Sequence, residues 1–249
     1  MEINDRNIKT WSAIGSRATF GMAVLDIAKK KENLMVLTCD VSTSAGLDRF
    51  RKTCPEKYLD LGIAEQLTQV TTTSSVQVRV GTSNSDLVIA SIIQPLMQNF
   101  GMGGVYITAS QTAPNVIEMM NTIGIDVSPI HFIDCVSSGI LGGTQNPYSN
   151  IGYIDSPIML ESMMLRTLHH LENSQIQQNF VILDSVNALS IYNEERILAE
   201  YLHTFINTCK NRQVLSLIVN VPDQTPAGVL SNLDLYCSDL IDRGQVVIS

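Results

Sequence analysis

The sequence lacks any apolar run of the roughly 20 residues that a helix needs to span a bilayer, and its N-terminus has no apolar signal core. It also lacks a basic stripe, since the net charge is −8 with only 16 Lys and Arg among 249 residues. Nonspecific nucleic-acid binders need such a stripe to neutralise phosphates. The composition therefore predicts a cytoplasmic protein without a membrane or nucleic-acid partner.

Metal-binding and disulfide patterns are also missing. The cysteines are scattered without a CxxC pair or a His at ligand spacing, at Cys39, Cys54, Cys135, Cys209 and Cys237. His169 and His170 are adjacent on an expected helix, so they cannot both face one metal ion. These patterns predict reduced thiols and no metal site.

The charge changes along the chain. Residues 1–65 carry a net charge of +1, whereas residues 66–249 carry −9. Between these parts lies a polar stretch, Thr71 to Ser85, which is the best candidate for a linker. The sequence therefore predicts two parts of different origin, with domains at 1–76 and 77–249.

The first part has a short alternation of helices and strands. Phe20, Val24, Ile27 and Ala28 share one face of an expected helix over Ser16–Lys31. Short apolar runs predict strands at Leu34–Cys39 and Tyr58–Leu61, with a short helix over Ser44–Arg51 between them.

The second part alternates more regularly. Strands are expected at Leu87–Ala90, Val105–Ala109, His131–Val136, Phe180–Leu183 and Leu215–Val221, with a final pair at Ser238–Asp242 and Gln245–Ile248. Helices are expected at Ile92–Phe100, Ala113–Gly124, Pro157–Glu172, Glu194–Asn211 and Pro226–Tyr236, and a long loop over Ser137–Ser156. This pattern predicts an α/β fold, with a mostly parallel sheet and helices on both faces.

A dense motif stands in the first part, from Arg17 to Gln66. It combines an R-x-x-F-G helix, a strand ending in Asp, Gly46-Leu47 and the run GIAEQ. It resembles the start of the pyrimidine-binding domain of transketolases and 1-deoxyxylulose-phosphate synthases. The resemblance implies a β-α unit of that family at the N-terminus.

The same resemblance implies a cofactor site. In that family the Glu of GIAEQ hydrogen-bonds the aminopyrimidine of thiamine diphosphate, so Glu65 would be catalytic and cofactor-binding, and Asp40 would be cofactor-binding. Glu65 would otherwise be a carboxylate in the first turn of a helix, where it suits the helix dipole.

The family pattern stops after Gln66. The sequence continues with Leu67-Thr-Gln-Val rather than a glycine- and alanine-rich helix, and it has no aromatic residue from there until Phe100. The G-D-G…N metal motif of the diphosphate module is also absent. A working transketolase would therefore need thiamine diphosphate, Mg²⁺ and a separate partner chain.

A second motif lies in the apolar run Phe180 to Val186, which ends in Asp184-Ser185. The order of elements from about residue 84 to 241 and this Walker-B-like strand resemble the RecA/KaiC ATPase fold, including archaeal KaiC-like proteins. The resemblance implies that Asp184 and Ser185 stand where active relatives support Mg²⁺. Alternatively, Asp184 is a strand-end Asp satisfied by backbone N–H groups.

The phosphate loop of that family is missing. The expected first strand at Leu87–Ala90 is followed by Ser91-Ile-Ile-Gln instead of G-x-x-x-x-G-K-[ST], and no Lys or Arg occurs from Asp86 to Met120. The function expected is therefore a non-catalytic, pseudo-ATPase regulatory or protein-interaction module that binds no cofactor. It would bind a protein partner or form a homo-oligomer, and the fusion could be natural, rearranged or engineered.

Overall fold

The computed structural model describes residues 5–31, 34–38, 45–54, 57–60, 74–82, 85–139, 148–242 and 245–247. The chain forms two compact units, Met1–Ile63 and Ala64–Ser249. The division lies nearer the N-terminus than the boundary after residue 76 that the sequence suggested.

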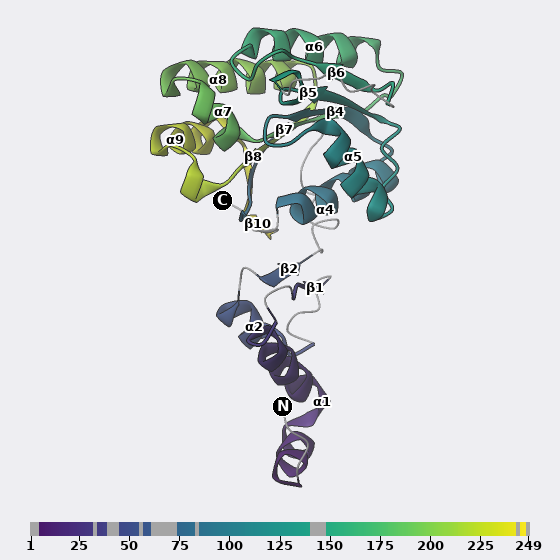
Figure 1. Ribbon diagram of the computed structural model, residues 1–249, viewed down its shortest axis with the longest axis vertical. Coiled ribbons are helices and arrows are strands. Elements are labelled where there is room, and N and C mark those ends of the chain that lie inside the picture. Colours follow the sequence, from purple (N-terminus) through teal and green to yellow (C-terminus); the bar gives the residue numbers. More distant parts are fainter. Residues whose placement is uncertain are drawn as a thin grey trace. The chain divides into compact units, whose positions relative to one another are not determined.

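The first unit is small (Figure 1). It consists of α1 (Asp5–Ala28), β1 (Val36–Thr38), α2 (Asp48–Thr53) and β2 (Tyr58–Asp60), with β1 and β2 parallel. Its core residues are Leu25, Ala28, Leu47, Phe50 and Tyr58.

The first helix differs from its prediction. It begins before Ser16 and bends at Gly15, whose φ of 82° lies in the left-handed region. Phe20 and Ile27, expected on the buried face, are 52% and 48% exposed, whereas Leu25 is 7% exposed. The predicted apolar face was therefore wrong in part, because Leu25 and Ala28 rather than Phe20 and Ile27 meet the small core.

The second unit is built on one eight-stranded sheet, as the α/β prediction required. All neighbouring strands are parallel except the edge pair β10–β9. In sheet order the strands are β10 (Gln245–Val247), β9 (Asp239–Asp242), β3 (Ser75–Arg79), β8 (Leu215–Asn220), β7 (Asn179–Asp184), β4 (Gly103–Thr108), β5 (Ile130–Asp134) and β6 (Ile151–Tyr153).

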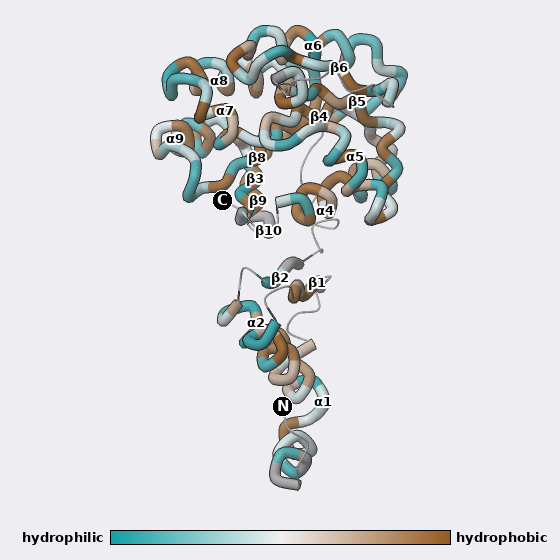
Figure 2. The backbone as a smooth tube through the Cα atoms, viewed as in Figure 1, coloured by the Kyte–Doolittle hydropathy of each residue, from teal (hydrophilic) through white to brown (hydrophobic). Residues whose placement is uncertain are grey.

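Helices cover both faces of this sheet (Figure 1). One face carries α4 (Ser85–Gln98) and α5 (Ala113–Thr122), and the other carries α6 (Leu160–Asn173), α7 (Val186–Tyr192), α8 (Glu195–Asn211) and α9 (Ala227–Tyr236). Helices on both faces bury the strands, which explains their nearly continuous apolar sequences (Figure 2).

Two predictions around residue 80 were wrong. The segment read as a linker contains β3, which is a central strand of the sheet between β8 and β9. Leu87–Ala90 is the first half of α4 rather than a strand. A short apolar run fits a buried strand and a buried helix equally well, and here apolar residues recur as far as Leu96 and Met97, a helical length.

Two short elements were not predicted. The helix α7 follows directly after β7, and β6 lies within the stretch expected to be a loop. Each has seven residues or fewer, so neither carries enough periodicity to be recognised in the sequence.

The core under α6 to α9 encloses two thiols. Cys135 and Cys209 are each 2% exposed, and burial raises the pKa of both to about 12. Tyr201 lies in the same cluster, and burial is the main cause that raises its pKa. These groups are therefore neutral members of an apolar core.

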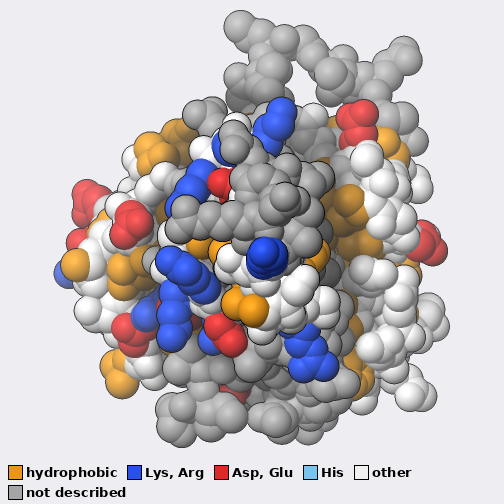
Figure 3. Space-filling view, turned by 90° about the horizontal axis from the view of Figure 1, so that it is seen from below, with side chains coloured by type: hydrophobic (Ala, Val, Ile, Leu, Met, Phe, Trp, Pro, Cys, Tyr) orange, Lys and Arg blue, Asp and Glu red, His pale blue; other side chains and the backbone are white. Residues whose placement is uncertain are grey.

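Charged side chains follow the division in the sequence. Residues 1–65 contain ten of the 16 Lys and Arg residues, and the side seen in Figure 3 shows Lys and Arg side chains together with some Asp and Glu side chains. Among the residues that the structure describes, none of the helices combines the length and apolar character needed to cross a bilayer.

Candidate functional site

The sequence-predicted residue Asp184 lies at the carboxyl edge of the sheet. Thr108 ends β4 and pairs in register with Asp134 of β5 on one side and Asp184 of β7 on the other. Because parallel strands place their carboxyl ends at the same edge, both Asp residues lie where ligands bind in open α/β sheets.

Asp184 is held by two hydroxyl groups. Its Oδ2 accepts hydrogen bonds from Tyr106 Oη at 2.6 Å and from Ser110 Oγ at 3.3 Å. The residue is 4% exposed, and burial raises its pKa to about 6, although both hydrogen bonds act in the opposite direction. Among the described residues, the partners of the Asp184 carboxyl are therefore side-chain hydroxyls rather than backbone N–H groups.

Ser185, the second sequence-predicted residue of this edge, is the N-cap of α7. It is 4% exposed, and its carbonyl oxygen accepts the Leu189 N–H at 3.1 Å. The peptide bond between Asp184 and Ser185 is cis. Ser185 thus begins the helix that the sequence did not predict.

Backbone N–H groups donate hydrogen bonds to Asp134, whereas the sequence had suggested such partners for Asp184. Its Oδ1 accepts the N–H groups of Val136 and Ser137, each at 2.8 Å. Its Oδ2 accepts the Ala113 N–H at 2.7 Å and the Ser137 hydroxyl at 2.6 Å. Asp134 therefore holds the start of α5 and the turn after β5, and its role is structural.

A second carboxylate approaches this edge from α4. Asp86 lies in the first turn of α4, and its Oδ1 accepts a hydrogen bond from Gln111 Nε2 at 3.1 Å. Its negative charge contributes to the raised pKa values of both Asp184 and Tyr106. Tyr106, Ser110 and Asp86 were not predicted from the sequence, because only the folded arrangement of β4, β7 and α4 brings them near Asp184.

The connection between β3 and α4 is the first strand-to-helix turn of this sheet, where a phosphate loop would stand. When the pattern G-x-x-x-x-G-K-[ST] is placed on Gly81, Asp86 takes the second Gly position, Leu87 the Lys and Val88 the hydroxyl. Between Arg79 and Arg166 the sequence has no Lys or Arg. The phosphate loop is therefore missing from the β3–α4 connection as well as from the residues after Leu87–Ala90, the segment that was predicted to be the first strand.

At the end of β3, Arg79 pairs in register with Asn220 of β8. Arg79 forms an ion pair with Asp234 of α9, so its charge is balanced away from the β3–α4 connection. Asn220 lies beside Arg79 in β8 and is fully buried. Its side-chain Nδ2 and Oδ1 have no hydrogen-bond partner in the part of the chain that the structure describes.

The cofactor residues expected from the transketolase resemblance, Glu65 and Asp40, lie outside the described residues. Across the described ranges, no group of three or more His, Cys, Asp or Glu side chains is placed to hold a metal ion.

Comparison with known proteins finds relatives of the transketolase-like part of the chain. No family model matches the chain. It is 43% identical over 47 residues to a 1-deoxy-D-xylulose-5-phosphate synthase of Clostridium botulinum, which is 19% of this chain and 8% of that protein. It is 40% identical over 52 residues to a protein of Methanocaldococcus jannaschii named "Putative transketolase C-terminal section", which is 21% of this chain and 16% of that protein.

Among solved structures, the chain has a partial match to a KaiC-like protein from Pyrococcus horikoshii. The TM-score is 0.48 at 14% identity, and the match covers 68% of this chain and 69% of that one. The chain thus spans under a fifth of the length of the two transketolase-like proteins, and the α/β fold of its second unit follows from its own sheet topology.

Proposed function

We propose that the second unit is a RecA-like regulatory module that binds a protein and does not hydrolyse a nucleotide. In this proposal it is fused to a transketolase-like N-terminal piece, and the whole chain is cytoplasmic. The observation that carries the proposal is the carboxyl edge of the sheet, where a buried Asp184 stands without a phosphate-binding loop beside it.

The charges at this edge support the proposal. A nucleotide phosphate would meet Asp86 in the first turn of α4 and Asp184 at the end of β7, with no Lys near the start of α4 in the sequence. Two carboxylates repel a phosphate, whereas a phosphate loop offers backbone N–H groups and a Lys. Tyr106 and Ser110 already occupy Oδ2 of Asp184, which an Mg²⁺ ion would otherwise contact directly or through water.

A protein partner or a second copy suits the remaining surface. Residues 66–249 carry a net charge of −9, which favours a basic surface on the partner. Exposed apolar side chains also occur on this unit, and they include Leu165, Ile191 and Leu235 at 68%, 77% and 78% exposure.

Calorimetric titration of the full chain with ATP and Mg²⁺ tests the absence of nucleotide chemistry, and light scattering after size-exclusion chromatography tests self-association. With ATP we expect no saturable heat and no release of phosphate. In light scattering we expect either a mass above that of one chain or, after a purified basic protein is added, the mass of a complex. Saturable ATP binding that is lost in Asp184→Ala would overturn the proposal.

A second candidate rests on the two transketolase-like matches. In this alternative the chain is the pyrimidine-binding half of a thiamine-diphosphate-dependent transketolase, with Glu65 on the pyrimidine and a partner chain that binds the diphosphate. Titration of the full chain with thiamine diphosphate and Mg²⁺, alone and with such a partner, distinguishes the candidates. Binding that disappears in Glu65→Gln but persists in Glu56→Gln would favour the alternative.

A further inference from the structure

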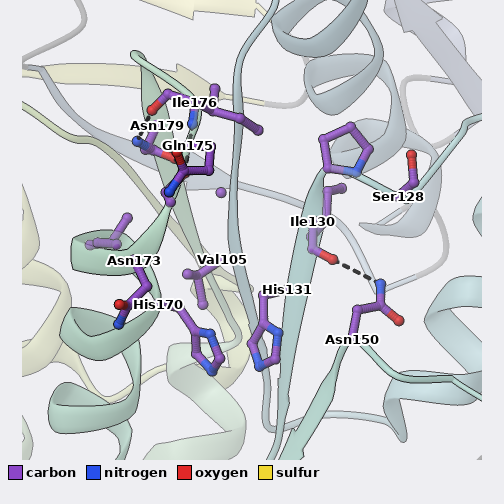
Figure 4. Close-up of a pocket in the computed structure, with 14 residues that line it drawn as sticks. Val105, Ser128, Ile130, His131, Asn150, His170, Asn173, Gln175, Ile176 and Asn179 are labelled. Atoms are coloured by element: carbon purple, nitrogen blue, oxygen red, sulfur yellow. Dashed lines mark hydrogen bonds between the residues drawn. The ribbon is translucent and has the colours of Figure 1, made fainter.

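A cavity of about 350 Å³ lies at the amino edge of the same sheet (Figure 4). It is formed by the starts of β4, β5 and β7 and by the last turn of α6. Its polar walls include Ser128, His131, Asn150, His170, Asn173 and Asn179. The cavity is therefore separate from the carboxyl edge that holds Asp184.

Two histidines form one wall of the cavity. The rings of His131 on β5 and His170 on α6 are stacked, with centroids 3.2 Å apart and planes inclined by 25°. Figure 4 shows them side by side, with Asn150 beyond His131 and Asn173 beyond His170. His169 adds a third imidazole, whose ring centroid lies 5.5 Å from that of His170.

The buried nitrogen of this pair is unsatisfied. Nε2 of His131 has no hydrogen-bond partner in the part of the chain that the structure describes. A methyl group at Gly152 of β6 would lie 3.4 Å from this nitrogen and 3.5 Å from Nη1 of Arg166. Both nitrogens therefore approach the same small space beside Gly152.

Positive charge near the pair has no counterpart. Arg166 is the only Lys or Arg between Arg79 and Arg196 in the sequence, and it forms no ion pair with a carboxylate of the described residues. The residues that line the cavity include no Asp or Glu. An anion in the cavity would therefore meet imidazole, amide, hydroxyl and apolar groups of the described residues, with the guanidinium of Arg166 close to His131 but outside the residues that line the cavity.

We propose that this cavity binds a small oxyanion, a carboxylate or a phosphate group, held by the His131–His170 pair and attracted by Arg166. The carboxylate and the phosphate share the chemistry that an imidazolium and a guanidinium recognise. A transition metal is a poorer fit, because the cluster offers no carboxylate and the stacked rings do not converge on one point.

Proton uptake accompanies this binding. Burial is the main cause that lowers the pKa of His131 to about 4, and the charges of His170, Arg166 and His169 lower it further. The pKa of His170 is also lowered, by burial and then by His169 and Arg166. All these charged neighbours of His131 lie on α6. The strands on either side of His131, β4 and β6, contribute the uncharged residues Val105 and Gly152.

The sign of the pH effect follows. The lowered pKa values of His131 and His170 favour the neutral imidazoles, and a bound anion raises both pKa values because it stabilises the protonated form. Binding and protonation therefore favour each other, so the affinity for the anion rises as the pH falls.

Titration of the full chain with sodium sulfate tests the site, because sulfate keeps its double charge between about pH 5.5 and pH 7.5 while histidines titrate. We expect saturable binding that tightens by up to about tenfold for each unit of pH decrease. Parallel titrations with inorganic phosphate and with acetate show which oxyanion is preferred.

Three variants give matched readouts. His131→Gln and His170→Gln are expected to weaken sulfate binding at least about tenfold at low pH, because each removes a protonatable ring. Gly152→Ala fills the space next to Nε2 and Nη1 in ordinary van der Waals contact, so it should weaken binding without unfolding the chain. His203→Gln, on the exposed side of α8, should leave binding unchanged.

Other outcomes overturn the proposal. Sulfate binding that is absent at low pH, that does not change with pH, or that survives both histidine substitutions would each do so. The same holds if Zn²⁺ binds the histidine pair while none of the three anions does. Far-ultraviolet circular dichroism of each variant separates loss of binding from loss of fold.

Discussion

The hydroxyl of Tyr106 on β4 donates a 2.6 Å hydrogen bond to Oδ2 of Asp184 on the neighbouring strand β7. Burial is the main cause that raises the pKa of Tyr106 well above its ordinary value, so the hydroxyl keeps its proton at neutral pH. The buried carboxyl of Asp184 is thus supported by a side chain of a neighbouring strand.

Tyr106→Phe removes this donor and keeps the ring. We expect the free energy of unfolding to fall by about 1–3 kcal/mol, because a buried carboxylate loses its shortest hydrogen bond. Urea unfolding at neutral pH measures the change. Tyr236→Phe is a suitable control, since its half-buried hydroxyl makes a longer bond of 3.3 Å to Asn232, and an equal loss in both variants would contradict the expectation.

Stability should depend on pH through Asp184. Its pKa is raised from 3.8 to about 6, so the folded state holds the proton more tightly than the unfolded state. The carboxyl therefore destabilises the fold above about pH 6, and this effect is lost as the pH falls towards the unfolded pKa of 3.8. A shift of this size corresponds to about 3 kcal/mol.

Asp184→Asn isolates that contribution. The variant should be more stable than the parent at neutral pH by up to about 3 kcal/mol, and the two should converge near about pH 4, because Asn mimics the protonated carboxyl. Urea unfolding of both proteins across this range measures the difference, in which other titrating groups cancel. A constant difference would show that Asp184 does not titrate in this window.

Asp134→Ala removes four hydrogen bonds from a fully buried side chain. We expect a loss of at least about 3 kcal/mol, because the N–H groups of Ala113, Val136 and Ser137 lose their acceptor. Thermal and urea unfolding measure it. Asp126→Ala is the matched control, since Asp126 is exposed and holds only Ser128, and its loss should stay below about 1 kcal/mol.

Gly104→Ala tests how closely β4 and β7 approach. A methyl group at Gly104 would overlap the carbonyl oxygen of Phe180, so we expect insoluble or strongly destabilised protein, by about 3 kcal/mol or more. Gly152→Ala in the same sheet meets no atom closer than 3.4 Å and should keep its thermal midpoint within a few degrees. Equal behaviour of the two variants would contradict the described register.

The sequence was sufficient to predict the end of β7, but not the side chains that surround Asp184 there. An apolar run that stops at Asp184-Ser185 predicts a buried strand and places the Asp at its carboxyl end. Tyr106 is 78 residues away, and only the pairing of Tyr106 with Ile182 places it on the same face of the sheet as Asp184. Such long-range register cannot be read from local periodicity.

The amino-edge cavity was missed for a similar reason. His169 and His170 are neighbours in the chain, and their adjacency on one expected helix argued against a shared metal ion. The structure instead stacks His170 on His131, which lies on another element 39 residues earlier. A helix packed on a sheet creates this pair, so the helical pattern alone does not contain it.

Because Cys135 and Cys209 are buried, their reactivity would report when the core of the second unit opens to solvent. Each thiol is 2% exposed with a pKa of about 12, so an alkylating reagent reaches it only when the helices separate from the sheet. Cys54, in the first unit, is half-buried and should react sooner. The order in which mass spectrometry finds these cysteines modified would give the order in which the parts of the chain open.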